Sequence, residues 1–419
     1  MKIVASSFGS AGDFLPALAV GAALRRRGHE VQFVGNPFYE TRVRNAGLGF
    51  IPAGEHWDVY DKIEKNPAYA DPANTGLLLR DLVGPNTEAT YRVTRDMLRS
   101  EPADIVVTND ANFGALWAAA EHGVPSVLVH ASPALWMSWQ APVVFGDWAP
   151  TGFLSRPITV AARWFMGWYM TRFLRPLAQQ IGTSLPDVSF AASERMAAIR
   201  LGLWSPTLRG PVKSDPKNGT ICGFARASAL GGTHRGVPRE VEAFLAAGPP
   251  PVVIALGSVY ALTSGQLLRN IAQACADSGH RCLVVGHPLG VEFPANTLAV
   301  RYAPYDEVFS RAAAVVVHGG AGTTGEALRC GRPVIGVPLA FDQFTLCSWI
   351  KKLGVGVRVP VAGRTRSGFG RVLERVLSDD SMKRRATGAS RRFAEERDGA
   401  ESGADAVESL AMQRLAARQ

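Results

Sequence analysis

The sequence predicts an α/β fold of two doubly wound domains, each built on a parallel sheet, that face one another across a cleft. The chain has 419 residues, of which 47% are hydrophobic, and is too long for one ordinary core. Apolar, β-branched runs alternate with helical patterns in both halves of the chain, as in βαβ units. Several of these runs stop at glycine-rich turns, and such sheets bind ligands beyond the carboxyl ends of their strands.

The first domain is predicted over residues 1–215 and begins with a strand over residues 1–8. A turn at residues 9–13, a helix over 15–28 and a strand over 30–34 complete the first βαβ unit. The pattern recurs as a strand, a helix and a strand over residues 104–108, 113–122 and 126–130. We therefore expect the first turn to border a ligand site.

Residues 136–190 break this alternation and are rich in aromatic side chains. Arginines interrupt the apolar segments, so a transmembrane span of about 20 residues is not available. A helical hairpin that lines an apolar pocket or touches a membrane surface fits this composition. Packing of the same aromatics in the core of the first domain fits it equally.

Residues 209–251 are rich in glycine, proline and basic residues, which is typical of a linker. The second domain is predicted over residues 216–395, with a turn at Gly257 and Ser258 after its first strand. Its expected strands cover residues 251–256, 281–285, 298–302, 313–317 and 333–337, and its first helix covers residues 266–278. A charged helical tail is predicted over residues 396–419.

The net charge of +9 fits nucleic acid, an anionic membrane surface or an anionic substrate. No nucleic-acid recognition motif occurs, and the basic clusters resemble helix faces, so we expect no nucleic-acid partner. The five cysteines lack CxxC spacing and are predicted to be free thiols in a reducing cytosol. The first apolar run is too short for a signal peptide. These features predict a cytoplasmic protein and leave open a contact with the cytoplasmic face of a membrane; the oligomeric state stays open.

The clearest ligand-binding signal lies at residues 315–326. A buried strand pattern ends at His318, glycines follow, and Thr323 and Thr324 precede the start of a helix. Glycines let the backbone approach an anion, the hydroxyls can donate hydrogen bonds, and a helix N-terminus favours negative charge. The segment therefore predicts a phosphate site.

The residues that define several enzyme classes are missing from this chain. The chain has no Gly-x-x-x-x-Gly-Lys-Ser/Thr loop, no three-glycine dinucleotide fingerprint and no Gly-x-Ser-x-Gly elbow. It also has no His/Cys cluster and no Asp-x-Asp pair that would hold a catalytic metal. We expect no metal and no cofactor.

Residues 318–326, with Asp342 and Gln343 after an apolar strand and Pro338, resemble the donor-binding signature of inverting nucleotide-sugar glycosyltransferases of the GT-B fold. Residues 301–304 resemble the start of that signature. Residues 9–16 resemble the first loop of bacterial antibiotic, sterol and rhamnolipid glycosyltransferases. The resemblance implies two Rossmann-like domains and transfer of a hexose from UDP- or dTDP-sugar to a hydroxyl of an apolar small molecule, either a natural-product aglycone or a lipid.

The same resemblance implies roles for individual residues. The diphosphate is expected to contact His318, Gly320, Gly322, Thr323, Thr324 and Ser258. Glu326 matches the position that accepts hydrogen bonds from the ribose, and Tyr302 matches the aromatic residue that packs on the base. Asp342 and Gln343 match the pair that binds the sugar hydroxyls. Plant members of the family carry Asn where this chain has Gly322.

Asp13 is the predicted general base. Many family members have His in the pattern Gly-His-x-x-Pro, whereas this chain has Gly-Asp-x-x-Pro. A carboxylate can remove the acceptor proton as the new bond forms, and burial raises its pKa usefully. Asp13 could instead cap a helix beginning at Phe14 or Leu15, and the two roles are compatible. Asp110 is expected to be a turn residue.

The acceptor side is predicted less specifically. His130, Trp136 and Trp139 follow a strand end in the first domain and are the expected acceptor contacts. Two other functions remain open: a sugar-nucleotide 2-epimerase of the same fold, and a non-catalytic partner protein that retains it. The sequence identifies neither the sugar, the base nor the acceptor.

Overall fold

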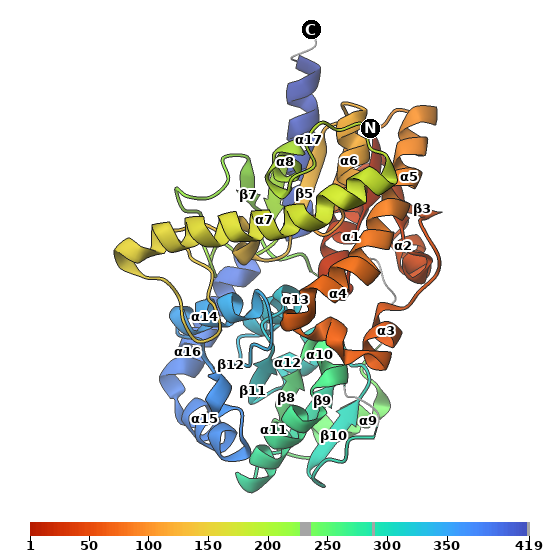
Figure 1. Cartoon of the computed structure of the whole chain (residues 1–419). Coiled ribbons are helices and arrows are strands. Elements are labelled where there is room, and N and C mark those ends of the chain that lie inside the picture. The colour runs from red at the N-terminus through yellow and green to blue at the C-terminus, as the bar shows by residue number, and fades with distance from the viewer. Residues whose placement is uncertain (227–235, 287–289, 417–419) are drawn as a thin grey trace.

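The computed structural model describes residues 1–226, 236–286 and 290–416, which form two α/β domains stacked end to end (Figure 1). Part of the predicted linker, residues 227–235, and the end of the predicted tail, residues 417–419, lie outside the described residues. Within the described part of the chain, each domain holds one parallel sheet with helices on both faces. The predicted fold of two doubly wound domains is confirmed.

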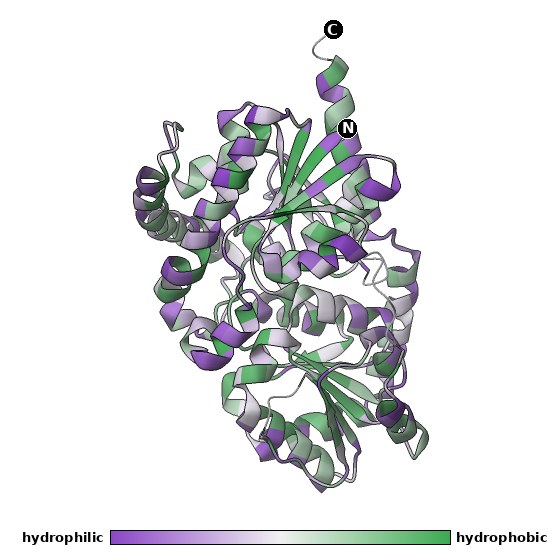
Figure 2. Cartoon of the chain, turned by 90° about the vertical axis from the view of Figure 1, so that its right-hand side faces the viewer, coloured by the Kyte–Doolittle hydropathy of each residue, from purple (hydrophilic) through white to green (hydrophobic). Residues whose placement is uncertain are grey.

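The first sheet has seven parallel strands in the order β3-β2-β1-β4-β5-β6-β7. Its strands are β1 (Lys2–Ser6), β2 (Glu30–Gly35), β3 (Gly49–Pro52), β4 (Ile105–Asn109), β5 (Ser126–His130), β6 (Ala197–Gly202) and β7 (Gly219–Ile221). The central strands are apolar on both faces, because helices cover both sides of a parallel sheet. Figure 2 shows these strands as hydrophobic bands inside more polar helices.

The second sheet has six parallel strands in the order β10-β9-β8-β11-β12-β13. Its strands are β8 (Val252–Ala255), β9 (Cys282–Val285), β10 (Thr297–Val300), β11 (Ala314–Val317), β12 (Val334–Gly336) and β13 (Gly356–Arg358). In each sheet the strand order reverses beside the first strand of the domain, between β1 and β4 and between β8 and β11. Such switch points are where doubly wound sheets bind ligands.

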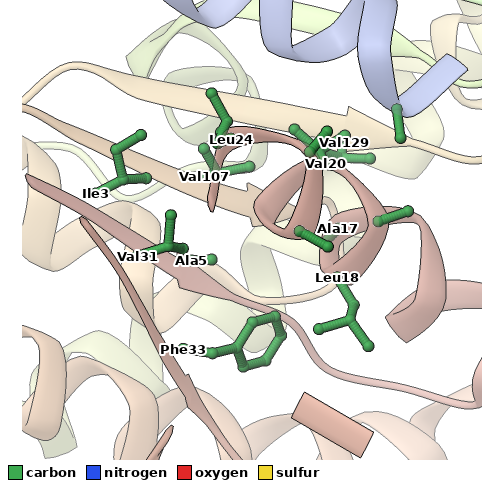
Figure 3. Packing of buried hydrophobic residues seen from close by; sticks show 14 of the residues in the cluster. Ile3, Ala5, Ala17, Leu18, Val20, Leu24, Val31, Phe33, Val107 and Val129 are labelled. Atoms are coloured by element: carbon green, nitrogen blue, oxygen red, sulfur yellow. The ribbon is translucent and has the colours of Figure 1, made fainter. Parts of the chain in front are cut away.

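The helices fill the layers around the sheets. They are α1 (Ala11–Arg26), α2 (Glu40–Asn45), α3 (Val59–Lys65), α4 (Thr75–Leu78), α5 (Gly84–Ser100), α6 (Phe113–Glu121), α7 (Ser155–Ile181), α8 (Phe190–Met196), α9 (Arg239–Ala246), α10 (Gly257–Thr263), α11 (Gly265–Asp277), α12 (Tyr305–Ser310), α13 (Ala321–Arg329), α14 (Gln343–Leu353), α15 (Arg366–Ser378), α16 (Asp380–Glu395) and α17 (Gly399–Ala416). Apolar side chains of α1, such as Leu18 and Val20, pack on Phe33, Val107 and Val129 of the first sheet (Figure 3).

The last helix returns to the first domain. Ala400, Ala404 and Val407 of α17 belong to the same core as α1, and Arg27 binds carboxylates of α17. The segment predicted as a tail is therefore a packed part of the first domain. The predicted boundary after residue 215 also falls too early, because β7 still pairs with β6.

Three further expectations differ from the structure. The strands β3, β6 and β13 were not predicted, and Gly257 and Ser258 begin the helix α10 instead of forming a turn. The expected hairpin within residues 136–190 is one long helix, α7, followed by the short α8. No helix among the described residues is long and apolar enough to cross a membrane.

Candidate active site

The strands at the two switch points carry polar side chains to the junction between the domains. Asp13 follows β1 and Asp110 follows β4, while Ser258 follows β8 and His318 follows β11. The two sets act on one another, since the charge of Asp13 raises the pKa values of Asp342 and Tyr260 in the second domain. The fold thus brings the predicted base and the predicted donor residues to one junction.

Asp13 is fixed in the first turn of α1. Its Oδ2 accepts hydrogen bonds from the backbone N–H and the hydroxyl of Ser10, both at 3.0 Å. Gly9 has a φ of 121°, and a Cβ there would lie 2.5 Å from Asp13 Oδ2, so only glycine fits this turn. The helix starts at Ala11, three residues earlier than the expected Phe14. Asp13 therefore supports the helix start, as the capping alternative proposed, and keeps Oδ1 for other partners.

The electrostatics of this junction favour protonated carboxyl groups. Asp13 is exposed at the junction, yet desolvation by nearby protein raises its pKa, against the hydrogen bonds from Ser10, which lower it. Burial, together with the charge of Asp13, raises the pKa of Asp110 to about 7. Burial also raises the pKa of Asp342 to about 6, although the Ser132 hydroxyl binds that carboxyl group. Asp110 lies in a turn, as expected, and is electrostatically linked to Asp13.

His318 is packed between two glycines. A Cβ on Gly257 would lie 2.5 Å from its Cε1, and a Cβ on Gly320 would lie 2.4 Å from its Nε2. The ring therefore touches the starts of both α10 and α13. Burial lowers the pKa of His318 to about 4, so the imidazole is neutral at physiological pH. A neutral ring carries a single N–H donor, for which the backbone carbonyl of Ala255 is a competing acceptor.

The start of α13 offers unused donors. Gly320 is the N-cap and provides no side chain, so the N–H groups of Ala321, Gly322 and Thr323 have no partner within the helix. The hydroxyl of Thr324 is fully buried, and no hydrogen-bond partner for it is present among the described residues. This arrangement favours an anion.

Glu326 lies one turn further along α13. Its carboxylate pairs with Arg329 at the same helix face, which holds it in place. Ser258 and Tyr302 are both exposed, and the ring of Tyr302 keeps 52% of its surface open to solvent. These positions are compatible with contacts to a nucleotide.

The loop before α14 is held in a strained form. Phe341 has a φ of 49°, which is unusual for a residue with a bulky side chain. Gln343 stabilises this turn, because its side-chain oxygen accepts hydrogen bonds from the N–H groups of Leu339 at 2.8 Å and Ala340 at 3.1 Å. The Gln343 side chain also forms a hydrogen bond with Tyr260 of α10. This contact of Gln343 with the loop backbone was not predicted from the sequence.

The predicted acceptor residues separate into different environments. Trp136 was expected to contact the acceptor, but it is 2% exposed and packs edge-on against Trp204 at 4.6 Å in a core that also holds residues of the second domain. That prediction is wrong, because the ring fills the seam between the domains. Trp139 is exposed. His130 is buried, and burial lowers its pKa to about 3.

Two residues that sequence reasoning missed connect the domains here. Tyr260 of α10 lies 6.1 Å from the His318 ring and packs with Val259 against α3 of the first domain. Tyr60 of α3 accepts a hydrogen bond at 3.0 Å from the N–H of Ala11, at the start of α1. An aromatic residue shortly after a glycine turn was the available signal for Tyr260.

One hollow on the described part of the chain lies away from the predicted site residues. A hollow of about 390 Å³ lies at the amino ends of the second sheet, beside Pro250, Ala313 and Pro333, away from the predicted site residues. Searching the described ranges finds no group of three His, Cys, Asp or Glu side chains suited to a metal ion. The junction is therefore the place where the fold and the polar residues coincide.

Two models of protein families match parts of this chain. Residues 3–80 match the glycosyltransferase family 28 N-terminal domain. Residues 285–411 match the C-terminal domain described as erythromycin biosynthesis protein CIII-like. The matches cover the first βαβ unit and most of the second domain.

Similar whole chains are also known. An uncharacterized glycosyltransferase of Mycobacterium bovis is 28% identical over 409 residues, covering 93% of this chain and 94% of its own. The O-mycaminosyltylonolide 6-deoxyallosyltransferase of Streptomyces fradiae is 28% identical over 432 residues, covering 100% and 99%. Both proteins are similar to this chain over nearly their whole length.

Solved structures share the fold. The glycosyltransferase of kitacinnamycin superposes with a TM-score of 0.73 at 20% identity, covering 98% of this chain and 99% of its own. The calicheamicin glycosyltransferase CalG4 superposes with a TM-score of 0.69 at 19% identity, covering 98% of each chain. The fold is thus that of the GT-B glycosyltransferases. The chain is similar to glycosyltransferases over its whole length, with a family 28-like segment in its first domain and an erythromycin CIII-like segment over most of its second domain.

Proposed function

We propose that this protein transfers a hexose from UDP- or dTDP-sugar to a hydroxyl of an apolar small molecule, with inversion and without a metal. The observation that carries the proposal is the open start of α13 beside the neutral His318, with Asp13 on the other side of the junction. The open start of α13 suits a diphosphate leaving group. Asp13 suits an acceptor hydroxyl that must lose a proton.

The diphosphate would lie at the start of α13. Its negative charge grows as the sugar leaves, and the free N–H groups and the dipole of α13 stabilise it without a metal ion. The neutral His318 adds one donor from the side of the ring. Two glycosyltransferases with similar folds, VinC and SsfS6, are known in complexes with dTDP, which supports a thymidine or uridine diphosphate here. Glu326 and Tyr302 would contact the ribose and the base.

The sugar would lie between the two domains. Asp342 and the amide of Gln343 are the side chains available for its hydroxyls, with Gln343 preset by its bonds to the 339–340 backbone. Oδ1 of Asp13 would take the acceptor proton while the acceptor oxygen attacks the anomeric carbon. The bond from that carbon to the phosphate oxygen breaks in the same step, and the nucleoside diphosphate leaves. One displacement of this kind inverts the anomeric centre.

The raised pKa of Asp13 supports its role as a base. A carboxylate with an ordinary pKa is a weak proton acceptor, and desolvation makes it stronger. The base acts only when it is deprotonated, so activity should fall as the pH drops through its raised pKa. The hydrogen bonds from Ser10 keep the group oriented while it changes charge.

The proposal is tested first by donor binding and then by transfer. Thermal unfolding is recorded with UDP, dTDP and, as a control, ADP, because a ligand that binds the native state raises the midpoint. The nucleotide that binds is then supplied as its glucose derivative with a panel of apolar alcohols, with and without EDTA. We expect a glycosylated product of inverted configuration and no effect of EDTA. Failure of every nucleotide to raise the midpoint would contradict the proposal, and an epimerised sugar formed without acceptor would assign the epimerase function instead.

A further inference from the structure

The exposed apolar side chains of this protein are concentrated in one segment. Among the described residues, the exposed large hydrophobic side chains outside residues 135–168 are Tyr302, Phe341, Val361, Met412 and Leu415. Inside that segment they are Leu135, Trp139, Phe145, Trp148, Phe153, Leu154, Val160, Trp164, Phe165, Met166 and Trp168. We call this set the aromatic face. Large contiguous apolar patches on a soluble domain mark an interaction site.

Much of the aromatic face lies on the N-terminal half of α7. Within residues 155–168 only Ser155 and Thr159 are buried, whereas the C-terminal half packs in the core through residues such as Leu174 and Leu177. In Figure 1 the yellow N-terminal part of α7 extends away from the body of the molecule. Val160, Trp164 and Trp168 are spaced by four residues and therefore share one side of the helix. That side is exposed and rich in tryptophan.

The charges of α7 have a single sign. The helix contains Arg156, Arg163, Arg172 and Arg175 and no acidic residue. The guanidinium of Arg172 lies 5.1 Å from the Trp168 ring centre, next to the apolar row. Arg163 pairs with Glu194 of α8 at 2.9 Å, so its charge is partly neutralised within the protein. An exposed helix with tryptophans on one side and arginines beside them matches helices that lie in the interface of an anionic bilayer.

We infer that the aromatic face docks the protein on an anionic lipid surface, with α7 lying in the headgroup region. A second copy of the chain is a poor occupant, because pairing two α7 helices would bring eight arginines together and the whole chain already carries a charge of +9. Spanning the bilayer is also excluded for the described helices. A peripheral contact would bury the apolar side of α7 in the lipid and place its arginines beside the anionic headgroups.

The aromatic face continues from α7 to the domain junction. The loop that carries Phe145 and Trp148 is tied to the second domain, because Val144 N–H donates to the Thr345 hydroxyl at 3.0 Å and Asp147 pairs with Arg358. Docking would therefore place the junction beside the bilayer surface. The inference does not depend on the acceptor, since vesicle binding is measured without any substrate.

The test is cosedimentation of the purified full chain with vesicles of phosphatidylcholine alone or with about 30% phosphatidylglycerol, the anionic component. We expect binding to the anionic vesicles that weakens with added salt. Trp164→Ser with Phe165→Ser should weaken it about tenfold or more. Arg156→Gln and Arg175→Gln should each weaken it about fivefold. The matched control changes Met412→Ser and Leu415→Ser, which are equally exposed but lie on α17, and should bind like wild type.

Thermal unfolding of every variant verifies that these surface changes leave the fold intact. The inference is overturned if the wild type does not bind the anionic vesicles, or if the Trp164 and Phe165 variant binds them as well as the α17 control. Sedimentation velocity gives the other decisive outcome. A dimer that is present in the wild type and lost in the Trp164 and Phe165 variant would assign the aromatic face to a second copy.

Discussion

Replacing Gly320 by Ala tests the packing around His318. A Cβ at this position would lie 2.4 Å from His318 Nε2, where ordinary contacts begin near 3.4 Å, so the ring must move by about 1 Å. Gly257 packs against the same Cε1–Nε2 edge of the ring, which limits the directions in which the ring can move. The backbone itself tolerates alanine, because φ at Gly320 is −68°. Overpacking of this kind costs about 1–3 kcal/mol of unfolding free energy.

Gly322→Ala is the matched control two residues further along. Nothing lies within 4 Å of a Cβ built there, and the residue is in the first turn of α13. Alanine should leave the stability unchanged or raise it by up to about 1 kcal/mol, because it restricts the unfolded chain. A side chain here also fits the family, since plant members carry Asn at this position.

The two variants should differ in nucleotide affinity as well. If His318 donates to the diphosphate, a shift of the ring removes a hydrogen bond to a charged group, worth about 1.5–3 kcal/mol, and raises Kd roughly 10–100-fold. Urea unfolding and calorimetric titration with UDP or dTDP measure both effects. Equal stability of the two variants would refute the position of the ring, and a destabilised Gly320→Ala with wild-type affinity would refute its contact with phosphate.

Three further changes test other parts of the structure. Ser10→Ala removes a hydroxyl that lowers the pKa of Asp13, so the pKa of Asp13 should rise. The acid limb of the pH profile of kcat/KM should therefore move to higher pH. An unchanged acid limb would mean that the titration of Asp13 does not set the pH dependence of the activity. Arg27→Ala removes contacts to three carboxylates of α17 and should cost about 2 kcal/mol in urea unfolding, whereas no loss would mean that α17 is held by its apolar side alone. Trp136→Ala should cost about 3–5 kcal/mol and Trp139→Ala less than about 0.5 kcal/mol, and similar costs for both would contradict their different burial.

The sequence predicted the central strands and the glycine-rich loop after β11 well because local pattern determines them. Uniformly β-branched runs such as that of β11 end at glycines, and this pattern locates His318 and the start of α13 without tertiary information. The three missed strands lack such a run. β3 and β13 contain glycine, and β6 holds the buried Arg200, whose charge is compensated by Glu194 of α8. Only the folded chain supplies such partners.

Contacts between the domains could not be predicted. Trp136 follows a strand end, which suggested a ligand contact, but its ring packs on Trp204 in the seam between the domains. The helix start at Ala11 was missed because residues 9–13 were assigned to a turn. The electrostatic link between Asp13 and Asp342 joins residues more than 300 positions apart. It exists only because both sheets point their carboxyl ends at one junction.

Asp13→Asn tests the central claim most directly. The amide oxygen of asparagine can still accept from the N–H and hydroxyl of Ser10, so the start of α1 should lose less than about 1 kcal/mol. Donor binding should be unchanged, because the proposed diphosphate contacts lie in the second domain. The measurement is the rate of glycosyl transfer at saturating donor. Our account predicts a fall of about 10²–10⁴-fold, and transfer within about tenfold of the wild-type rate would contradict it.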